Sequence, residues 1–302
     1  MLTKIALPAA FVLIWSSGYL VGTIGVHAGS PLALIAWRFL IALVVITIIS
    51  LATRAPWPTN PRTYLHLLIT GILLQTIQLG SVYLGLAAGV PAALSSVILG
   101  ASPLLVAAAG QPLLGERLAP RQWTGLVIGL AGVIVCLSPT LTTGHQHLAG
   151  YLFTGIALIG YAGGTLYQKR FGQTVDLRTG TAVQLLGATI TSFPLAALHG
   201  GLHLPLTPAS LGSLAWLGTI NSIGAFMVLF TLLRTRTGGA ATSLLYLVPP
   251  VTAILAVPLL HQPLTSAVII GMLVSGVGVT LASITRTRAT RPKPCIDAAT
   301  GC

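Results

Sequence analysis

Long apolar runs follow one another along almost the whole chain and constrain its fold more than any other feature. Each is close to the roughly 20 residues that a helix needs to cross the hydrocarbon core of a bilayer. Charged residues make up 6% of the chain, against about 25% in a soluble domain. We therefore predict an all-α integral membrane protein with ten transmembrane helices. The runs are 5–24, 31–51, 64–86, 90–113, 120–138, 148–168, 179–198, 210–233, 239–260 and 264–284.

The lysine and arginine residues fit this segmentation. If the N-terminus is cytoplasmic, the inside segments hold every cation except Arg38, which lies within a predicted helix, and the outside loops hold none. By the positive-inside rule, we expect a multi-pass protein of the bacterial inner membrane with both termini in the cytoplasm. The net charge of +12 then reflects membrane orientation, and we predict no nucleic-acid partner. The inside cations are Lys4, Arg54, Arg62, Arg117, Arg121, Lys169, Arg170, Arg178, Arg234, Arg236, Arg286, Arg288, Arg291 and Lys293.

An internal repeat has a constant offset of 146 positions, as from Pro103 to Pro249. Several residues between Pro112 and Gly132 recur, without a gap, at that offset. The offset carries the first predicted helix onto the sixth, so the repeat unit is five helices. An odd number of crossings inverts the second copy, as in many secondary transporters. We predict two inverted five-helix repeats around a central cavity, in residues 1–144 and 145–284, followed by a basic cytoplasmic tail, 285–302, that we expect to be disordered.

A motif at the end of the first repeat is similar to a known family pattern. Pro103 is followed by Leu114-Gly115-Glu116-Arg117-Leu118, then by Gly125 and Gly132. This run closely resembles the signature of EamA-type transporters, which belong to the drug/metabolite transporter superfamily. Trp15-Ser16-Ser17-Gly18 and Arg38-Phe39 also resemble the family pattern.

The resemblance covers nearly the whole chain except the tail. It implies ten helices, two inverted halves, a central cavity, and export of amino acids or related metabolites, but it does not imply one substrate. The second half departs from the pattern, because Gln262-Pro263 stands where the first half has Glu116-Arg117. This departure weakens any requirement for Glu116 in the mechanism.

Polar and aromatic side chains near the predicted helix midpoints form a candidate substrate site. Polar groups in a bilayer are costly and tend to face a cavity, and a midplane site between inverted repeats is the expected place for substrate. The alternative for the amides is interhelical hydrogen bonding, and for the aromatics it is packing or, at Tyr19, the interfacial aromatic belt. The candidate substrate-binding residues are Trp15, Tyr19, Arg38, Gln75, Gln78, Tyr161, Gln184, Asn221 and Tyr246.

Arg38 is the one cation predicted within a membrane helix. A cation near the bilayer centre costs at least ~2.5–3.5 kcal/mol on insertion scales, so something must compensate it. One hypothesis is that Arg38 binds a substrate carboxylate in a water-filled cavity. The other is that it is structural, with carbonyl or hydroxyl groups of a neighbouring helix around it.

Prolines and small residues mark positions where helices bend or approach closely. Pro103, Pro249 and Pro250 remove helical hydrogen bonds at mid-span, so each is a candidate hinge or a purely structural kink. Gly125-xxx-Gly129 and Gly271-xxx-Ser275 permit close helix packing. These stripes serve contacts either within the chain or between the copies of a homodimer.

Few residues could support chemistry. Glu116, Asp176 and Asp297 are the three acids, and all lie in predicted loops or the tail. Membrane enzymes usually need carboxylates, a metal cluster or an activated nucleophile, so we predict that the protein is not an enzyme and uses no cofactor. The histidine pairs His145/His147 and His199/His203 have no cysteine or carboxylate nearby, and we predict no metal site.

The leading function is therefore transport of a small-molecule substrate across the lipid bilayer. A receptor is disfavoured because inverted repeats suit alternating access. A multidrug pump for cations would need an acid within the membrane, and the chain has none there. We predict export of zwitterionic or anionic metabolites such as amino acids, with multidrug or other small-solute efflux as the alternative.

Overall fold

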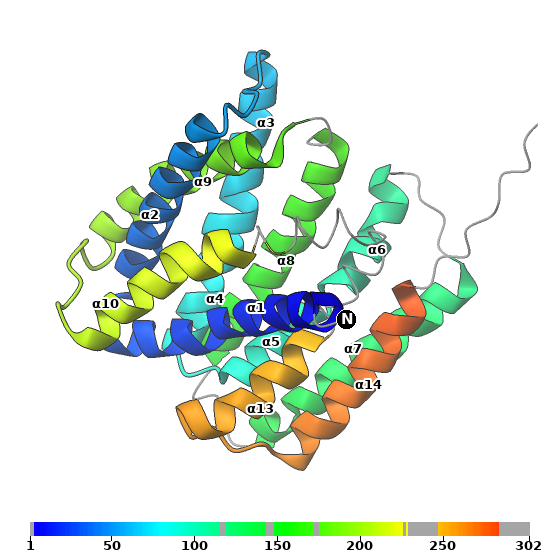
Figure 1. Cartoon of the computed structure of the whole chain (residues 1–302). Helices are drawn as coiled ribbons and strands as arrows, with labels where there is room; N and C mark the ends of the chain where they lie inside the picture. Colours follow the sequence, from blue (N-terminus) through cyan, green and yellow to red (C-terminus); the bar gives the residue numbers. More distant parts are fainter. Residues whose placement is uncertain are drawn as a thin grey trace, which may run out of the picture.

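The computed structural model describes residues 3–114, 119–142, 148–171, 175–225, 228 and 247–283. Every regular element within these ranges is helical (Figure 1). When directly continuous elements are joined, and α5 and α6 are joined across Ala101, the described residues form ten helical rods in the order of the ten apolar runs. The all-α prediction is confirmed.

The first five rods contain eight elements. They are α1 (Thr3–Ala28), α2 (Pro31–Ala52), the continuous α3 (Pro61–Gly71), η1 (Ile72–Ile77) and α4 (Gln78–Ala87), the pair α5 (Ala92–Gly100) and α6 (Ser102–Leu114), and α7 (Pro120–Thr142).

The second five rods follow the same order. They are α8 (Leu148–Phe171), α9 (Leu177–Leu198), the continuous α10 (Pro208–Ala215) and η3 (Trp216–Gly224), α13 (Val248–Leu260), and α14 (Ser266–Ser283).

Short polar caps start several rods. Ser30 and Asn60 precede α2 and α3, and each accepts a hydrogen bond from a backbone N–H of the first turn. Thr207 does the same at α10, accepting from the backbone N–H of Ser210 at 3.2 Å. A proline follows each of the three caps, where its missing N–H leaves no helical bond unmade. These caps explain why the three rods begin at or up to three residues before the start of their apolar runs.

Three rods contain irregular backbone near their middle. The fourth rod is interrupted at Ala101, two residues before Pro103. The third and eighth rods each include a π-helical segment, η1 and η3, in which the turns are wider than in an α-helix. Pro249 and Pro250 lie in the first turn of α13. The residues just before Leu247 lie outside the described ranges.

The small-residue stripes bring α7 and α14 into close contact within the chain. A side chain at Gly132 would overlap the backbone of Gly271 and Ser275. A side chain at Gly278 would likewise overlap the backbone of Gly129 and come 2.7 Å from the Gly125 carbonyl oxygen. Of the two uses predicted for these stripes, the structure therefore contains the intramolecular one.

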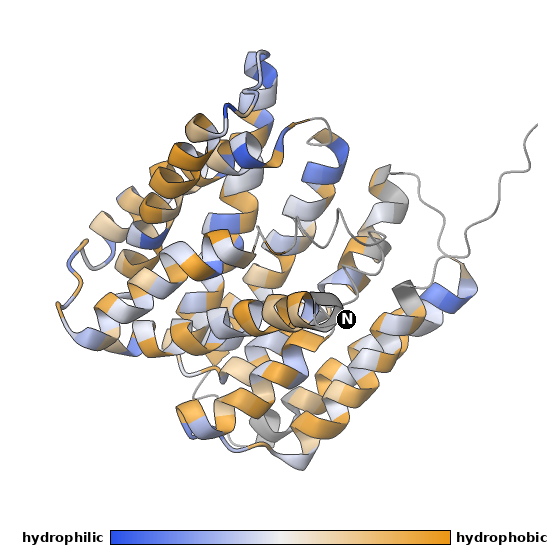
Figure 2. Ribbon diagram, in the orientation of Figure 1, coloured by the Kyte–Doolittle hydropathy of each residue, from blue (hydrophilic) through white to orange (hydrophobic). Residues whose placement is uncertain are grey.

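Length and composition make several helices suitable for crossing a membrane. Six are long and apolar enough, and three shorter apolar helices are Pro120–Cys136, Val248–Leu260 and Ser266–Leu281. Figure 2 shows hydrophobic residues along the rods and hydrophilic residues gathered near several of their ends. Large apolar side chains such as Val127 and Ile159 are 68% and 69% exposed, as expected where lipid is the solvent. The six longer helices are Ala6–Ala28, Pro31–Ala52, Pro61–Ala87, Ala92–Gly110, Leu148–Phe171 and Leu177–Leu198.

Two connections meet at one end of the bundle. The Thr179 hydroxyl donates a hydrogen bond to the Pro56 carbonyl at 2.9 Å, and the rings of His66 and Phe171 stack with centroids 4.4 Å apart. The α2–α3 and α8–α9 connections therefore lie together. We call this the cationic end, because it carries Arg54, Arg62, Lys169, Arg170 and Arg178.

The opposite end is held by contacts between α1, α2, α5 and the second half of the chain. The Ser210 hydroxyl donates to the Ala28 carbonyl at 3.2 Å, and the Trp37 indole N–H donates to the Leu202 carbonyl at 2.9 Å. The Ala92 backbone N–H donates to the Gln262 side-chain oxygen at 3.1 Å. We call this the far end.

Candidate functional site

A cavity of about 590 Å³ lies in the middle of the bundle. Its walls come from both halves of the chain, and they include Arg38, Tyr83, Gln168 and Asp176. Because Asp176 directly precedes α9 beside the α2–α3 connection, the cavity extends from the bundle centre toward the cationic end. Its volume suits a small metabolite, since ligand pockets typically measure about 300–1,000 Å³.

Most of the residues that the sequence singled out meet at this cavity. Tyr246 lies outside the described residues, so its position stays a prediction. Of the three candidate hinge prolines, Pro103 and Pro249 line the cavity, while Pro250 is half-buried and does not appear in its wall. The substrate-site candidates that line it are Trp15, Tyr19, Arg38, Gln75, Gln78, Tyr161, Gln184 and Asn221.

Arg38 is 4% exposed, and neutral partners surround its guanidinium group. Its Nε donates to the Ser222 hydroxyl at 3.2 Å, and Nη2 donates to the Asn221 side-chain oxygen at 2.8 Å. Nη1 donates to the Tyr83 hydroxyl, whose ring centroid lies 5.5 Å from the Arg38 Cζ atom. These dipoles stabilise a buried cation without cancelling its charge. Three of the five guanidinium N–H groups are used in this way among the described residues.

The π-helical segment η3 presents two of those partners. The Ser222 hydroxyl donates to the Leu217 carbonyl, five residues earlier, at 2.7 Å, so its oxygen still accepts from Arg38. The Asn221 amide nitrogen donates to the Ile14 carbonyl at 2.7 Å. Asn221 thus links α1 to α2 across the cavity. Gly18 makes room for it, because a Cβ there would lie 2.9 Å from the Asn221 amide nitrogen.

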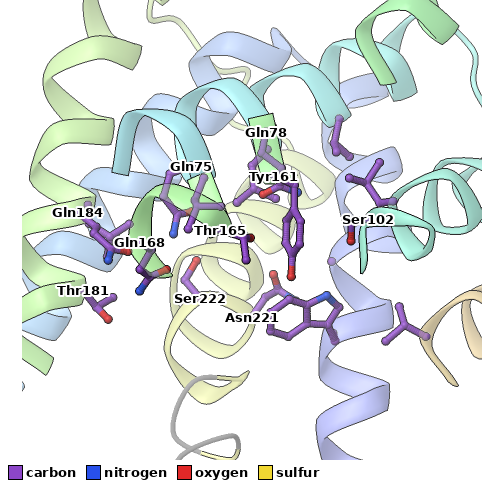
Figure 3. Close-up of a pocket in the computed structure, with 18 of the residues that line it drawn as sticks. Gln75, Gln78, Ser102, Tyr161, Thr165, Gln168, Thr181, Gln184, Asn221 and Ser222 are labelled. Atoms are coloured by element: carbon purple, nitrogen blue, oxygen red, sulfur yellow. The ribbon is translucent and has the colours of Figure 1, made fainter. Parts of the chain in front are cut away.

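A wall of side-chain amides faces the part of the cavity nearer the cationic end. Figure 3 shows Gln75, Gln168 and Gln184 extending into it from η1, α8 and α9. Thr165 and Thr181 lie beside them in the same view. Amides and hydroxyls both donate and accept hydrogen bonds, so this wall could bind the polar groups of many small solutes.

Aromatic side chains form another wall. Phe11 and Trp15 pack with ring centroids 5.4 Å apart, and both line the cavity together with Tyr19 and Tyr161. In Figure 3 the ring of Tyr161 extends toward Asn221. An apolar ligand body could pack on this wall while its polar groups bind Arg38 or the amides.

Asp176 is the one acidic residue among the described residues that line the cavity. It already forms an ion pair with Arg178. Its carboxylate accepts from the Arg178 Nε at 3.0 Å and Nη2 at 2.8 Å, and from the Arg178 backbone N–H at 2.9 Å. These bonds from Arg178 hold the pKa of the Asp176 carboxyl below its usual range. Asp176 therefore caps α9 and is engaged within its own turn.

The sequence did not identify several residues of the cavity wall. Tyr83 and Ser222 complete the surroundings of Arg38, and Thr165, Gln168 and Thr181 extend the polar wall. A signal for two of them was present, because Tyr161, Thr165 and Gln168 have the i, i+4, i+7 spacing of one helix face. No comparable pattern marks Tyr83 or Ser222.

From the sequence we predicted no metal site. The described ranges contain no group of three His, Cys, Asp or Glu side chains that could hold a metal ion. His145 and His147 lie outside those ranges.

Comparisons with known proteins match this architecture. The model of the EamA-like transporter family matches residues 3–138 and again 148–284. The "Uncharacterized inner membrane transporter YedA" of Escherichia coli (strain K12) is 30% identical over 251 residues, which cover 82% of this chain and 79% of that protein. A "Probable amino-acid metabolite efflux pump" of Salmonella typhimurium is 26% identical over 269 residues, covering 86% and 88%.

A solved structure, titled "Crystal structure of protein", superposes with a TM-score of 0.62 at 20% identity and covers 92% of this chain and 95% of that one. This likeness supports the fold alone. Both halves of the sequence match the same family model, and together the matches cover almost all of the chain. The protein is therefore a membrane transporter that belongs to the EamA-like transporter family.

Proposed function

We propose that the protein exports amino acids or related carboxylate-bearing metabolites across the bacterial inner membrane by alternating access at the central cavity. The observation that carries this proposal is Arg38, a buried cation on the cavity wall whose three described partners are all neutral. A site of this kind attracts a carboxylate and repels a simple cation. No step of this function requires covalent catalysis or a cofactor.

The electrostatics of the wall favour zwitterions and anions. Among the described lining residues the acid is Asp176, which Arg178 already pairs at 2.8 Å. A carboxylate at Arg38 would therefore meet no competing acid in the deep part of the cavity. The amides Gln75 and Gln184 and the aromatic wall could then accept the remaining polar and apolar parts of a metabolite.

The proposed inverted repeat has support from helix bounds. Shifted by 146 positions, α2 (Pro31–Ala52) coincides with α9 (Leu177–Leu198), and α6 (Ser102–Leu114) coincides with α13 (Val248–Leu260). The shift also carries the π segment η1 into η3. These correspondences favour two halves built alike, in residues 1–144 and 145–284.

Contacts between α7 and α14 give independent support. Gly132 packs on Gly271, and their counterparts at the same offset, Gly278 and Gly125, pack on one another. Reciprocal contacts of this kind are expected when a two-fold axis relates two units. With five crossings in each half the axis lies in the membrane plane, and we propose that the cationic end faces the cytoplasm.

Efflux of drugs or other uncharged solutes is the second candidate, and the aromatic wall of Phe11, Trp15, Tyr19 and Tyr161 favours it. Such solutes would use the apolar wall and would not need the charge of Arg38. The two candidates therefore differ in whether a carboxylate is required.

Flux into proteoliposomes separates the candidates. Purified protein is reconstituted, and uptake of a labelled amino acid is compared with that of an uncharged analogue that keeps the same side chain and has neither the carboxylate nor the amine. We expect flux of the amino acid above protein-free liposomes and little protein-dependent flux of the uncharged analogue. Equal flux of both would favour the second candidate, and no flux of any solute tested would contradict transport by this chain alone.

A further inference from the structure

The repeat relates the two sides of the cavity residue by residue. At the offset of 146 positions, Arg38 on α2 corresponds to Gln184 on α9, and Asn221 in η3 corresponds to Gln75 in η1. The contact between Arg38 and Asn221 therefore has a counterpart between Gln184 and Gln75. All four side chains line the same cavity.

The two contacts differ in the present conformation. Arg38 Nη2 donates to the Asn221 side-chain oxygen at 2.8 Å, and Asn221 in turn donates to the Ile14 carbonyl at 2.7 Å. Within the described part of the chain, no hydrogen bond joins Gln75 to Gln184. The cavity continues from this unbonded pair toward the cationic end, through Gln168 and Asp176. Arg38 and Tyr83 are buried, whereas Gln168 and Asp176 are partly exposed, so we take the bonded pair to lie on the closed side and the unbonded pair on the open side.

The backbone already holds the unbonded pair near each other. Gly71 packs directly on the Gln184 carbonyl group, and Gln75 lies one helical turn beyond Gly71. The Thr76 hydroxyl also contacts the Thr191 hydroxyl at 2.7 Å. These contacts keep the two segments adjacent, so a rotation of the Gln75 segment would move its side chain relative to Gln184.

The π-helical segments can supply such a rotation. A π turn holds one residue more than an α turn, and its conversion to α-helix rotates the residues beyond it by about 100° around the axis. Gln75 and Asn221 both lie inside π segments. Both segments are π-helical in this conformation, and a change of winding in either one would reorient its amide.

We propose that the Arg38–Asn221 contact closes the far side of the cavity in this conformation, and that Gln75 and Gln184 form the equivalent contact when the cavity opens to the far end. The two contacts alternate, so only one is made in each state. This inference rests on the alternating access proposed above, and it assigns Gln75, Gln184 and Asn221 as positioning residues that set the balance between the two states.

The test measures that balance without any transport. Gln168→Cys is placed in a background in which the native cysteines are replaced, and a membrane-impermeant maleimide is added at the cationic end in inside-out vesicles. The labelling rate reports the population open to that end. The variants are Asn221→Ala, Asn221→Asp and Gln75→Ala, with Gln78→Ala as a matched control, because the repeat counterpart of Gln78 is Gly224 and offers no polar partner.

Opposite shifts are expected. Asn221→Ala should lower the ratio of the state open to the cationic end over the state open to the far end about tenfold, since it removes a charge-assisted bond worth at least ~1.4 kcal/mol, whereas Asn221→Asp should raise this ratio by pairing Arg38 with a carboxylate. Gln75→Ala removes a neutral bond of the other state, so the same ratio should rise about threefold and the labelling rate should rise with it. When it is combined with Asn221→Ala, Gln75→Ala should restore part of the labelling that Asn221→Ala alone loses. Gln78→Ala combined in the same way should not.

Shifts of Asn221→Ala and Gln75→Ala in the same direction, or no shift in either, would overturn the inference, as would a fall in labelling for Asn221→Asp. If Asn221→Ala is not recovered as monodisperse protein, Asn221→Asp and Gln75→Ala decide the outcome by themselves. Flux of the parent protein is measured separately. A parent that transports while its variants fail to shift contradicts the paired contacts alone, whereas a parent that moves no solute contradicts the proposed function.

Discussion

Replacement of Arg38 by glutamine should change transport far more than stability. The substitution leaves few polar groups without partners, because Ser222 also bonds the Leu217 carbonyl and Asn221 also bonds the Ile14 carbonyl. The principal loss is the hydrogen bond that Arg38 Nη2 donates to the Asn221 side-chain oxygen, at about 1–3 kcal/mol. Removal of a buried cation offsets this by about 2.5–3.5 kcal/mol. We therefore expect the detergent-stable yield and melting temperature of Arg38→Gln to stay near those of the parent.

The effect on carboxylate transport follows from the bonds that a substrate would lose. A hydrogen bond to a charged group contributes about 1.5–3 kcal/mol, which corresponds to roughly 10- to 150-fold in affinity. Flux of amino acids at low concentration should fall by such a factor in Arg38→Gln. Flux of neutral analogues without a carboxylate should change less. Both are measured in proteoliposomes together with the yield of folded protein from the same preparation.

Arg38→Lys is the matched variant, since lysine keeps the charge and loses the planar fork of donors. It should retain more amino-acid flux than Arg38→Gln but less than the parent. A poorly folded Arg38→Gln protein whose flux falls equally for all solutes would refute this reasoning. Arg38 would then be required for packing and not for substrate.

Further predictions concern the fold and energetics. Gly278→Ala should lower the melting temperature strongly because its Cβ would overlap Gly129, whereas Gly276→Ala, with open space around its Cβ, should not. A cysteine at Thr142 should react only from the periplasm, as the topology requires. Because Arg178 lowers the pKa of Asp176, Asp176→Asn should lose stability at neutral pH, and the difference should vanish as acid protonates the parent carboxyl. Since the three acids lie outside the predicted helices, we expect facilitated diffusion or coupling without an intramembrane acid; flux that strictly requires a pH gradient and is abolished by Glu116→Gln would refute this.

The rods were predictable because each depends on local signals. Apolar length fixes the number of crossings, and Ser30, Asn60 and Thr207 with the prolines after them mark helix starts that the structure contains. The π segments were not predictable in the same way. Their winding depends on contacts with other rods, such as Gly71 against the Gln184 backbone. Composition alone does not predict such contacts.

The sequence predicted the depth of the candidate site's residues in the membrane, but not the direction in which their side chains point. Midpoints of predicted helices placed Trp15, Gln75 and Asn221 at one level of the membrane, and all three line the cavity. The rotation of each helix about its axis decides which neighbours meet, and the sequence leaves that rotation open. For this reason the partners of Arg38, above all Tyr83 and Ser222, emerged only from the structure.

Those partners also change the question that the sequence raised about Arg38. A structural arginine and a substrate-binding arginine were taken as alternatives, yet the surroundings satisfy the conditions of both. Tyr83, Asn221 and Ser222 contribute dipoles that make burial tolerable, and none of them contributes a negative charge. A guanidinium held in this way is fixed in position and still electrically unpaired. That combination is what a carboxylate site in a membrane needs, because a flexible cation would lose entropy on binding and a paired one would have no charge to offer.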